Sequence, residues 1–238
     1  MDAEDLLLWS DDALLAVNKP AGLRTIADGY DPTLPHLAGL LNKHYGKVWV
    51  VHRLDKDTSG VMLFARSAEA HRALNTQFEQ RETHKVYHTL VVGMPEWEEI
   101  TIDLPLQVDG DRKHRTVINH QTGKAAETSF QVLQRLGAFS LLAARPHSGY
   151  THQIRAHLAA VGLPLLADPL YKSLQPETQA SRTAAAMALS LPIRRTALHA
   201  FEITFQHPFS SEVITLQAPY PEDFRQTLHQ LRQQVPRE

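Results

Sequence analysis

Residues 52–60, with the sequence HRLDKDTSG, constrain this chain more than any other segment. They place the carboxylate of Asp55 between cationic side chains and a Thr-Ser-Gly turn, and the apolar run at residues 61–65 follows directly. The run predicts a buried strand, so the charged motif must lie at the edge of a hydrophobic core. Proteins place charged groups there mostly where chemistry requires them, which makes Asp55 a candidate functional residue.

The composition is that of an ordinary globular protein. The chain has 238 residues, of which 43% are hydrophobic and 21% charged, enough to bury a core. It contains no cysteine, which excludes disulfides, thiolate metal sites and cysteine nucleophiles. No apolar run approaches the ~20 residues of a membrane helix, and the N-terminus lacks a signal-peptide pattern. We expect a soluble, cytoplasmic protein.

The charge balance argues mildly against a general nucleic-acid binder. The formal net charge is −2 and the isoelectric point is about 6.7, whereas such binders carry a basic excess. The cations nevertheless cluster along the chain, at Arg112, Lys113, His114, Arg115, Lys124, Arg145, His147, His152, Arg155 and His157. Because a local basic surface can bind phosphates while acids lie elsewhere, we expect weak, salt-sensitive RNA binding.

Hydrophobic periodicity and turn residues predict the secondary structure. Strands are predicted at residues 6–9, 14–18, 48–51, 61–65, 85–92, 125–133, 139–144, 198–205 and 213–217. Helices are predicted at residues 37–44, 67–81 with Ser67 as N-cap, 151–161 and 224–234. Residues 93–106 are punctuated by turn formers, residues 109–111 form a turn at the tip of a hairpin arm, and residues 173–192 form a surface excursion.

Many strands with interspersed helices, and little strict alternation of the two, indicate the α+β class with a mixed, mostly antiparallel sheet flanked by helices and loops. No repeat and no long linker divides the sequence. We therefore expect a single domain over residues 1–238, with two subdomains sharing one sheet as the alternative.

Residue types alone leave the role of the opening motif open. Asp55 and Asp57 could form a general acid/base pair as in glycosidases, but two residues apart on an extended chain they project to opposite sides. A calcium loop fails because Arg66 stands where that loop needs a glutamate. The remaining interpretation is a hairpin turn whose aspartate caps the local backbone.

Several blocks of the sequence resemble the RluA family of RNA pseudouridine synthases. They are VNKPAG at residues 17–22, HRLDKDTSG at 52–60, KVYHTLVVG at 85–93, SGYTHQIRAHL at 148–158, DPLY at 168–171 and LHA at 198–200. The blocks occur in the family's order and span about residues 14–220. The resemblance implies a pseudouridine-synthase catalytic domain that needs no cofactor and isomerises uridine in structured rRNA or tRNA to pseudouridine.

The resemblance also assigns catalytic roles. Asp55 is implied to be the nucleophile, and Arg155 the cation that favours its ionised form. Tyr87 is implied to stack on the released uracil and to serve in removal of the C5 proton. Arg53 is implied to fill the space left by a flipped base. We expect His52 to position the loop rather than to take part in the chemistry. The structural alternatives are a solvated helix arginine for Arg155 and a core aromatic for Tyr87.

Further residues are candidates for RNA contacts. Arg112, Lys113 and Arg115 lie on the predicted arm and can bind phosphates, although a solvated loop explains them equally well. Tyr150 stands where the family usually has arginine, and a tyrosine there can stack on a base. His152 follows in the same block.

The sequence points away from metal binding and from a second RNA-binding domain. His147, His152 and His157 are spaced by five, which does not put them on one helical face. The chain begins too close to its first motif for the N-terminal RNA-binding domain of longer relatives, so we expect recognition by the catalytic domain and a monomer.

Two rival functions remain from the sequence. A non-catalytic RNA-binding module would not require the set of Asp55, Tyr87 and Arg155. A carbohydrate-active hydrolase would need a second carboxylate in a matching block and a groove rich in stacking aromatics, yet the chain has three tryptophans.

Overall fold

The computed structural model describes residues 2–171, 184, 186–210 and 212–234. The chain divides into two compact units. The first unit comprises Met1–Lys85 and His199–Tyr220, and the second comprises Val86–Leu198 and Pro221–Glu238. Each unit is thus assembled from two segments that are distant in the sequence.

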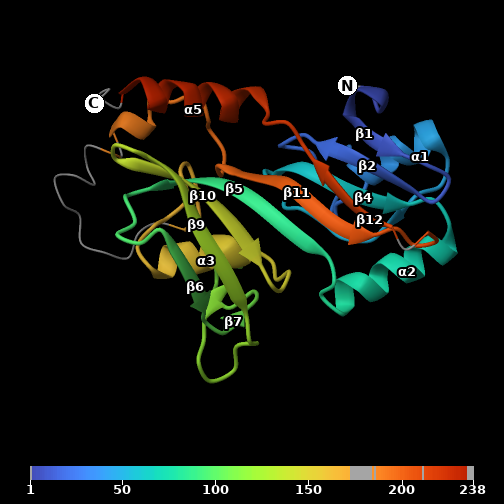
Figure 1. Ribbon diagram of the computed structural model, residues 1–238, viewed down its shortest axis with the longest axis horizontal. Helices are drawn as coiled ribbons and strands as arrows, with labels where there is room; N and C mark the ends of the chain where they lie inside the picture. The colour runs from blue at the N-terminus through green and yellow to red at the C-terminus, as the bar shows by residue number, and fades with distance from the viewer. Residues whose placement is uncertain (1, 172–183, 185, 211, 235–238) are drawn as a thin grey trace. The chain divides into compact units, whose positions relative to one another are not determined.

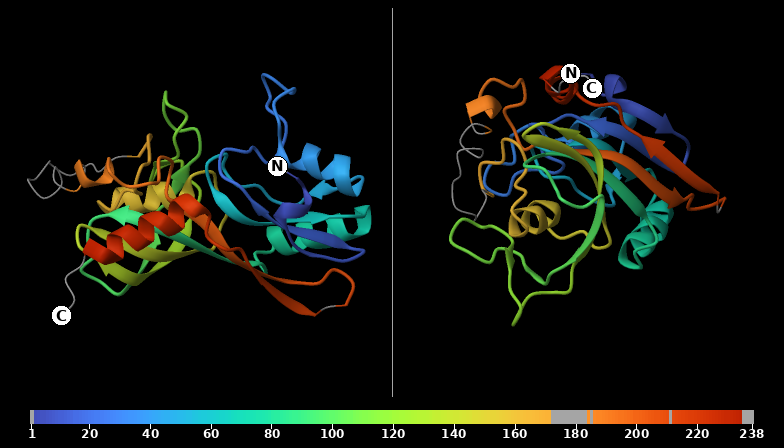
Figure 2. Two further views of the ribbon diagram at one scale, coloured as in Figure 1. Left: turned by 90° about the horizontal axis from the view of Figure 1, so that it is seen from above. Right: turned by 60° about the vertical axis from the view of Figure 1, so that its left-hand side comes forward.

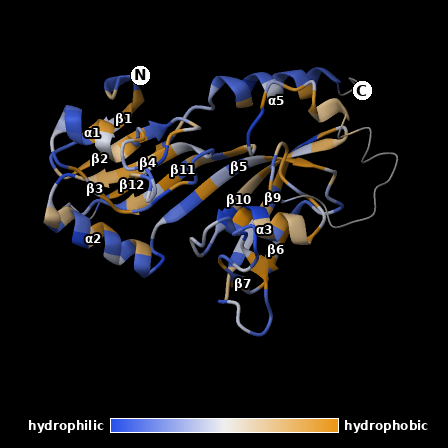
Figure 3. Cartoon of the chain, turned by 180° about the vertical axis from the view of Figure 1, so that it is seen from behind, coloured by the Kyte–Doolittle hydropathy of each residue, from blue (hydrophilic) through white to orange (hydrophobic). Residues whose placement is uncertain are grey.

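The first unit contains a mixed sheet centred on β4 (Figure 1). Its strands are β1 (Leu7–Ser10), β2 (Leu14–Lys19), β3 (Trp49–Val50), β4 (Ser59–Ala65), β11 (Leu198–Gln206) and β12 (Val213–Gln217). Strand β4 is antiparallel to β2 and β3 and parallel to β11, while β1 and β12 add antiparallel strands to β2 and β11. Every residue of β4 is buried, as its apolar run predicts. Figure 3 shows the hydrophobic colouring of these strands.

Three helical segments belong to the first unit: the 3-10 turn η1 (Glu4–Leu6), α1 (Leu37–Tyr45) and α2 (Ala68–Glu79). The N-cap prediction for α2 is confirmed, because Ser67 Oγ accepts a hydrogen bond from the Ala70 amide at 3.1 Å. The buried amide of Gln77 on α2 bonds both the amide and the carbonyl of Gln206 at the end of β11. The helix is thereby tied to the sheet by polar contacts as well as apolar ones.

The second unit contains an antiparallel sheet of β5 (His84–Val92), β10 (Phe139–Pro146), β9 (Glu127–Leu136) and β6 (Glu99–Asp103), in that order. Strands β7 (Leu106–Gln107) and β8 (Val117–Ile118) form a short separate ribbon. The ribbon carries residues 108–116, which we call the arm. Figure 2 shows the arm in green, projecting from its ribbon.

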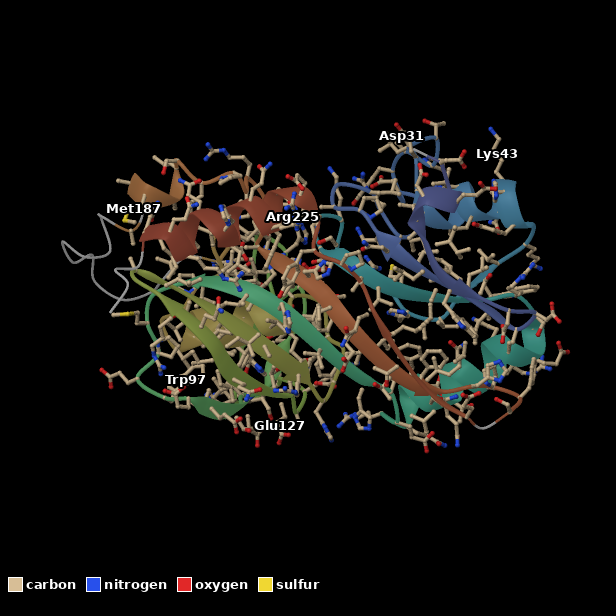
Figure 4. All side chains as sticks on the ribbon, turned by 45° about the horizontal axis from the view of Figure 1, so that its top comes forward. Asp31, Lys43, Trp97, Glu127, Met187 and Arg225 are labelled. Atoms are coloured by element: carbon tan, nitrogen blue, oxygen red, sulfur yellow. The ribbon has the colours of Figure 1, made fainter. Side chains whose placement is uncertain are left out.

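Helices α3 (Gln153–Ala160) and α5 (Glu222–Gln234) also belong to the second unit, and residues 186–188 are helical as well. All of α3 except Ala160 is buried, because this helix enters the core of the unit. The core includes Val91, Ile102, Phe130, Leu142, Ile154, Leu158 and Leu165. Helix α5 buries Phe224, Leu228 and Leu231 and turns a polar face outward, where Arg225, labelled in Figure 4, lies exposed.

The α+β class and the mixed, mostly antiparallel strand pairing are confirmed. Strand β6 lies in the stretch that the sequence left as punctuated loop, and residues 172–183 and 185 of the predicted 173–192 excursion lie outside the described residues. The expectation of one domain stays a prediction. Within the described part of the chain, no helix has the length and apolar content to cross a membrane.

Candidate active site

The backbone on both sides of Asp55 is held by hydrogen bonds within the first unit. On the N-terminal side, Thr25 Oγ1 donates to the carbonyl of Leu54 at 3.1 Å and accepts from the amide of Leu54 at 3.3 Å. On the C-terminal side, the amide of Thr58 donates to the carbonyl of Asp55 itself at 3.1 Å. The Asp55 side chain is half-buried and Arg53 is exposed, so a fixed backbone presents a partly accessible carboxylate.

Lys19 of the NKPAG block stabilises the loop that carries Asp55. Its side chain is fully buried, and its ammonium donates to the carbonyls of Pro20, Leu23 and Lys56 at 2.9, 2.8 and 3.0 Å. The Lys56 carbonyl also accepts from the amide of Gly22 at 2.9 Å. A buried ammonium requires such acceptors, and here they tie the first motif of the sequence to the residue after Asp55.

The Thr-Ser-Gly end of the motif packs against the LHA block of β11. Ser59 pairs with His199 and Gly60 with Ala200 across the parallel strands. A Cβ atom on Gly60 would lie 2.1 Å from the carbonyl oxygen of Ala200, and Gly60 has a φ of +119°, so only glycine fits. His199 Nε2 donates to the carbonyl of Ala218 at 3.0 Å, which leaves Nδ1 to accept from Ser59 Oγ at 2.9 Å.

His52 contacts both strand β4 and helix α2. Its Nε2 accepts from the amide of Leu63 at 2.9 Å, and its ring stacks on Phe78 with centroids 4.8 Å apart. Burial, with a smaller contribution from the charge of Lys85, lowers the pKa of His52 to about 3. The imidazole is therefore neutral at physiological pH and serves as an acceptor.

In the second unit, the QIRAH block fastens α3 to β9. Gln153 Nε2 donates to the carbonyl of Glu127, labelled in Figure 4, at 2.9 Å, and to Thr128 Oγ1 at 3.0 Å. His157 bonds Thr128 Oγ1 through Nδ1 and the carbonyl of Leu104 through Nε2, both at 3.0 Å. Burial lowers the pKa of His157 below its usual value. These polar residues of the block are structural clamps that fix the helix carrying Arg155.

Arg155 is buried rather than solvated. Its Nε and Nη2 donate to the two carboxylate oxygens of Asp168 at 2.7 and 2.8 Å, and the side chains are 7% and 0% exposed. Asp168 Oδ1 also accepts from the amides of Leu170 and Tyr171. The solvated-arginine alternative is thus wrong, and the DPLY block supplies the anchor of this arginine.

Tyr87 lies on β5 opposite Ala144 of β10 and packs, half-buried, against the core of the second unit. It combines an aromatic contact with the core and partial exposure, as a residue that stacks on a base requires.

The predicted RNA-contact residues of the second unit divide into exposed and inward-facing ones. Arg112 and Lys113 are exposed on the arm, whereas Arg115 is half-buried and bonds Asp111 through Nε at 2.7 Å. Tyr150 is half-buried against a small apolar cluster. His152 caps α3 with a φ of +58°, an uncommon backbone conformation outside glycine.

The candidate residues fall on both units. Arg53 and Asp55 belong to the first, and Tyr87, Arg155 and the arm to the second. The pairing of Arg155 with Asp55 stays a prediction. Sequence reasoning did not assign roles to Lys19, Asp168 and His199, although each lies in a recognised block. Among the described residues, no group of three or more histidine or acidic side chains is arranged to hold a metal ion.

The fold and the blocks identify the class of protein. The family model for RNA pseudouridylate synthases matches residues 13–160. The chain belongs to this family, whose members are isomerases that convert uridine in RNA to pseudouridine, and its resemblance to RluA-type enzymes is confirmed.

Particular relatives agree over nearly the whole chain. The dual-specificity RNA pseudouridine synthase RluA of Vibrio vulnificus is 35% identical and is matched over 91% of this chain and 84% of its own length. The ribosomal large subunit pseudouridine synthase D of Xanthomonas campestris is 37% identical over 95% of this chain and 69% of its own. Among solved structures, human RNA pseudouridylate synthase domain containing 4 aligns with a TM-score of 0.76 at 26% identity, covering 97% of this chain and 95% of that one.

Proposed function

We propose that this enzyme isomerises specific uridines in structured rRNA or tRNA, with Asp55 as the nucleophile and with flipping of the target base. The substrate class is supported by the relatives, since one is named a dual-specificity enzyme and others are named for the large ribosomal subunit.

The reaction needs a nucleophile at the sugar and no redox step. The Asp55 carboxylate attacks C1′, the N1–C1′ bond breaks, and uracil leaves as an anion. The base then turns, C5 bonds to C1′ as the carboxylate leaves, the C5 proton is transferred to a base, and N1 takes up a proton from water. In this scheme the phenol of Tyr87 stacks on the uracil and assists that last proton transfer.

Arg53 and Arg155 have supporting roles in the proposal. A base inside an RNA helix cannot be attacked, so the enzyme must extrude it, and exposed Arg53, two residues from Asp55, is suited to enter the vacated space. Arg155 favours the ionised carboxylate through its charge. Asp168 takes the Nε–Nη2 edge of its guanidinium.

The observation that carries the proposal is the rigid support of a partly exposed carboxylate. The chain is fixed at Leu54 by Thr25 and at Lys56 by buried Lys19, while the side chain of Asp55 between them stays half-buried. A turn with no chemical role does not need a buried ammonium beneath it. Catalytic groups do need such preorganisation, because misplacement by about 1 Å can reduce a rate ~100-fold.

The test is tritium release from RNA labelled at C5 of uridine, with total tRNA and total rRNA assayed separately. We expect wild-type enzyme to release tritium from one of them and Asp55→Asn to release none. Asp57→Asn is the matched control, because it makes the same change in the same loop and should retain most of the activity.

Two results would contradict the proposal. Activity of Asp55→Asn within tenfold of wild type would show that Asp55 is not the nucleophile. Binding of both RNAs without release from either would favour the non-catalytic binding module. For Arg53, the Arg53→Ala variant should slow reaction with structured RNA more than with a heat-denatured, single-stranded form of the same RNA, and equal slowing would argue against a flipping role.

A further inference from the structure

The arm is held to the second unit at the DPLY block and also at Thr151, just before α3, where the Thr116 hydroxyl donates to the Thr151 carbonyl at 2.5 Å. Arg115 Nη1 at the base of the arm donates to the carbonyl of Leu170 at 3.1 Å, while its Nε bonds Asp111 at 2.7 Å. Asp111 also accepts from the amides of Lys113 and Arg115, so it folds the arm locally. Arg115 therefore links the arm to the DPLY turn through hydrogen bonds to both.

Tyr171 forms the second attachment. Its hydroxyl accepts from the amide of Thr116 at 2.8 Å and donates to the carbonyl of Thr116 at 3.1 Å. The hydroxyl also lies 3.2 Å from His152 Nδ1 at the start of α3. Tyr171 is 6% exposed, so these bonds are shielded from water and constrain the last residue of the arm.

The same turn holds Arg155. The ring centroid of Tyr171 lies 4.9 Å from Arg155 Cζ, a cation–π distance. The amides of Leu170 and Tyr171 fix Asp168, whose carboxylate takes the Nε–Nη2 edge of Arg155. The Leu170 carbonyl accepts from the arm and the Leu170 amide donates to Asp168, so this turn joins the arm to the carboxylate that holds the guanidinium.

We propose that Tyr171 is a positioning residue that couples the arm to Arg155, so that RNA phosphates bound at Arg112 and Lys113 set the orientation of the guanidinium during the reaction. This inference rests on the proposed function, because it gives Arg155 a part in the chemistry. It adds that the arm contributes to the rate of isomerisation and not only to RNA affinity.

The test is a double-mutant cycle with two separate readouts. The arm is neutralised by Arg112→Ala together with Lys113→Ala, in the wild-type background and in Tyr171→Phe. Phenylalanine keeps the ring against Arg155 and removes only the hydroxyl. For each protein we would measure the dissociation constant for the RNA that releases tritium, and the single-turnover rate of release at saturating RNA.

In the wild-type background, neutralising the arm should weaken RNA binding. It should also lower the rate of tritium release at saturating RNA about fivefold or more, the lower end of typical coupling between sites. Tyr171→Phe alone should lower the rate by a similar factor with affinity changed less than twofold. In the Tyr171→Phe background, neutralising the arm should weaken RNA binding while changing the rate of release less than twofold.

A matched control separates positioning from general destabilisation. Ser140→Ala removes another buried hydroxyl of the same unit, one that donates to the carbonyl of Gly93 at 2.9 Å, and should leave rate and affinity unchanged. The inference is overturned if arm neutralisation changes affinity alone, changes neither quantity, or lowers the rate equally in both backgrounds. Each of these leaves the proposed function intact provided that Asp55→Asn is inactive, whereas an active Asp55→Asn refutes the proposed function itself.

Discussion

Replacing Lys19 by methionine isolates the role of the buried ammonium beneath the Asp55 loop. Methionine keeps most of the apolar volume of the stem and removes the charge that bonds the carbonyls of Pro20, Leu23 and Lys56. The Lys56 carbonyl keeps its hydrogen bond from the Gly22 amide. The carbonyls of Pro20 and Leu23 lose the ammonium as a donor.

The magnitude follows from those two carbonyls. Leaving a buried acceptor unsatisfied costs about 1–3 kcal/mol, and removing a buried charge recovers part of that sum, so we expect a net loss of about 2–4 kcal/mol. This is a large share of the ~5–15 kcal/mol by which domains are typically stable, yet it leaves Lys19→Met folded. Because the support of Lys56 is weakened, the rate of tritium release should fall more than RNA affinity does.

The assay is urea unfolding followed by circular dichroism, with the free energy taken from the midpoint at constant slope. Lys43→Met is the control, because Lys43 is an exposed lysine on α1 and its replacement should change the free energy of unfolding by less than about 0.5 kcal/mol. A loss for Lys19→Met of under about 1 kcal/mol, or one equal to the control, would refute the argument.

Three further predictions follow from the same structure. Gly60→Ala should destabilise the protein by more than about 3 kcal/mol, because its Cβ meets the backbone of β11, whereas Gly22→Ala, which has open space and only its positive φ to overcome, should cost about 1 kcal/mol in the same urea titration. The free energy of unfolding should decrease as the pH falls from 6.5 towards 3, because the lowered pKa of His52 means that the unfolded chain binds a proton there and the folded chain does not. His52→Gln can still accept a hydrogen bond but does not titrate, so its free energy of unfolding should decrease less steeply. An unchanged slope in that variant would count against this account. Asp168→Asn should cost about 3–5 kcal/mol by removing the carboxylate that pairs with the buried Arg155 guanidinium, and adding Arg155→Met should recover part of that loss, so a double variant less stable than the single one would contradict the ion-pair argument.

The sequence predicted local structure well where a local pattern carried the information. The apolar run of β4 and the cap at Ser67 are properties of adjacent residues, and both are confirmed. Strand β6 was missed although its five residues alternate exposed positions with part-buried Ile100 and buried Ile102, because so short an alternation between turn formers gives a weak signal.

Contacts between blocks were not predictable in the same way. The ammonium of Lys19 reaches a carbonyl 37 residues away, and Arg155 pairs with an aspartate 13 residues away across a turn. Nothing in the local composition of either segment specifies such a partner. A buried lysine and a buried arginine must have partners, but only the folded chain shows which ones they are.

The order in which the chain leaves the ribosome matters for the loop that carries Asp55. Strand β4 pairs with β11, and the hydrogen bond between Ser59 and His199 joins residues 140 positions apart. A nascent chain that has exposed the whole HRLDKDTSG segment still lacks the strand against which Gly60 packs, so the first unit completes only after nearly all of the second has been synthesised. Chains interrupted before β11 therefore carry Asp55, the proposed nucleophile, on an unfinished sheet.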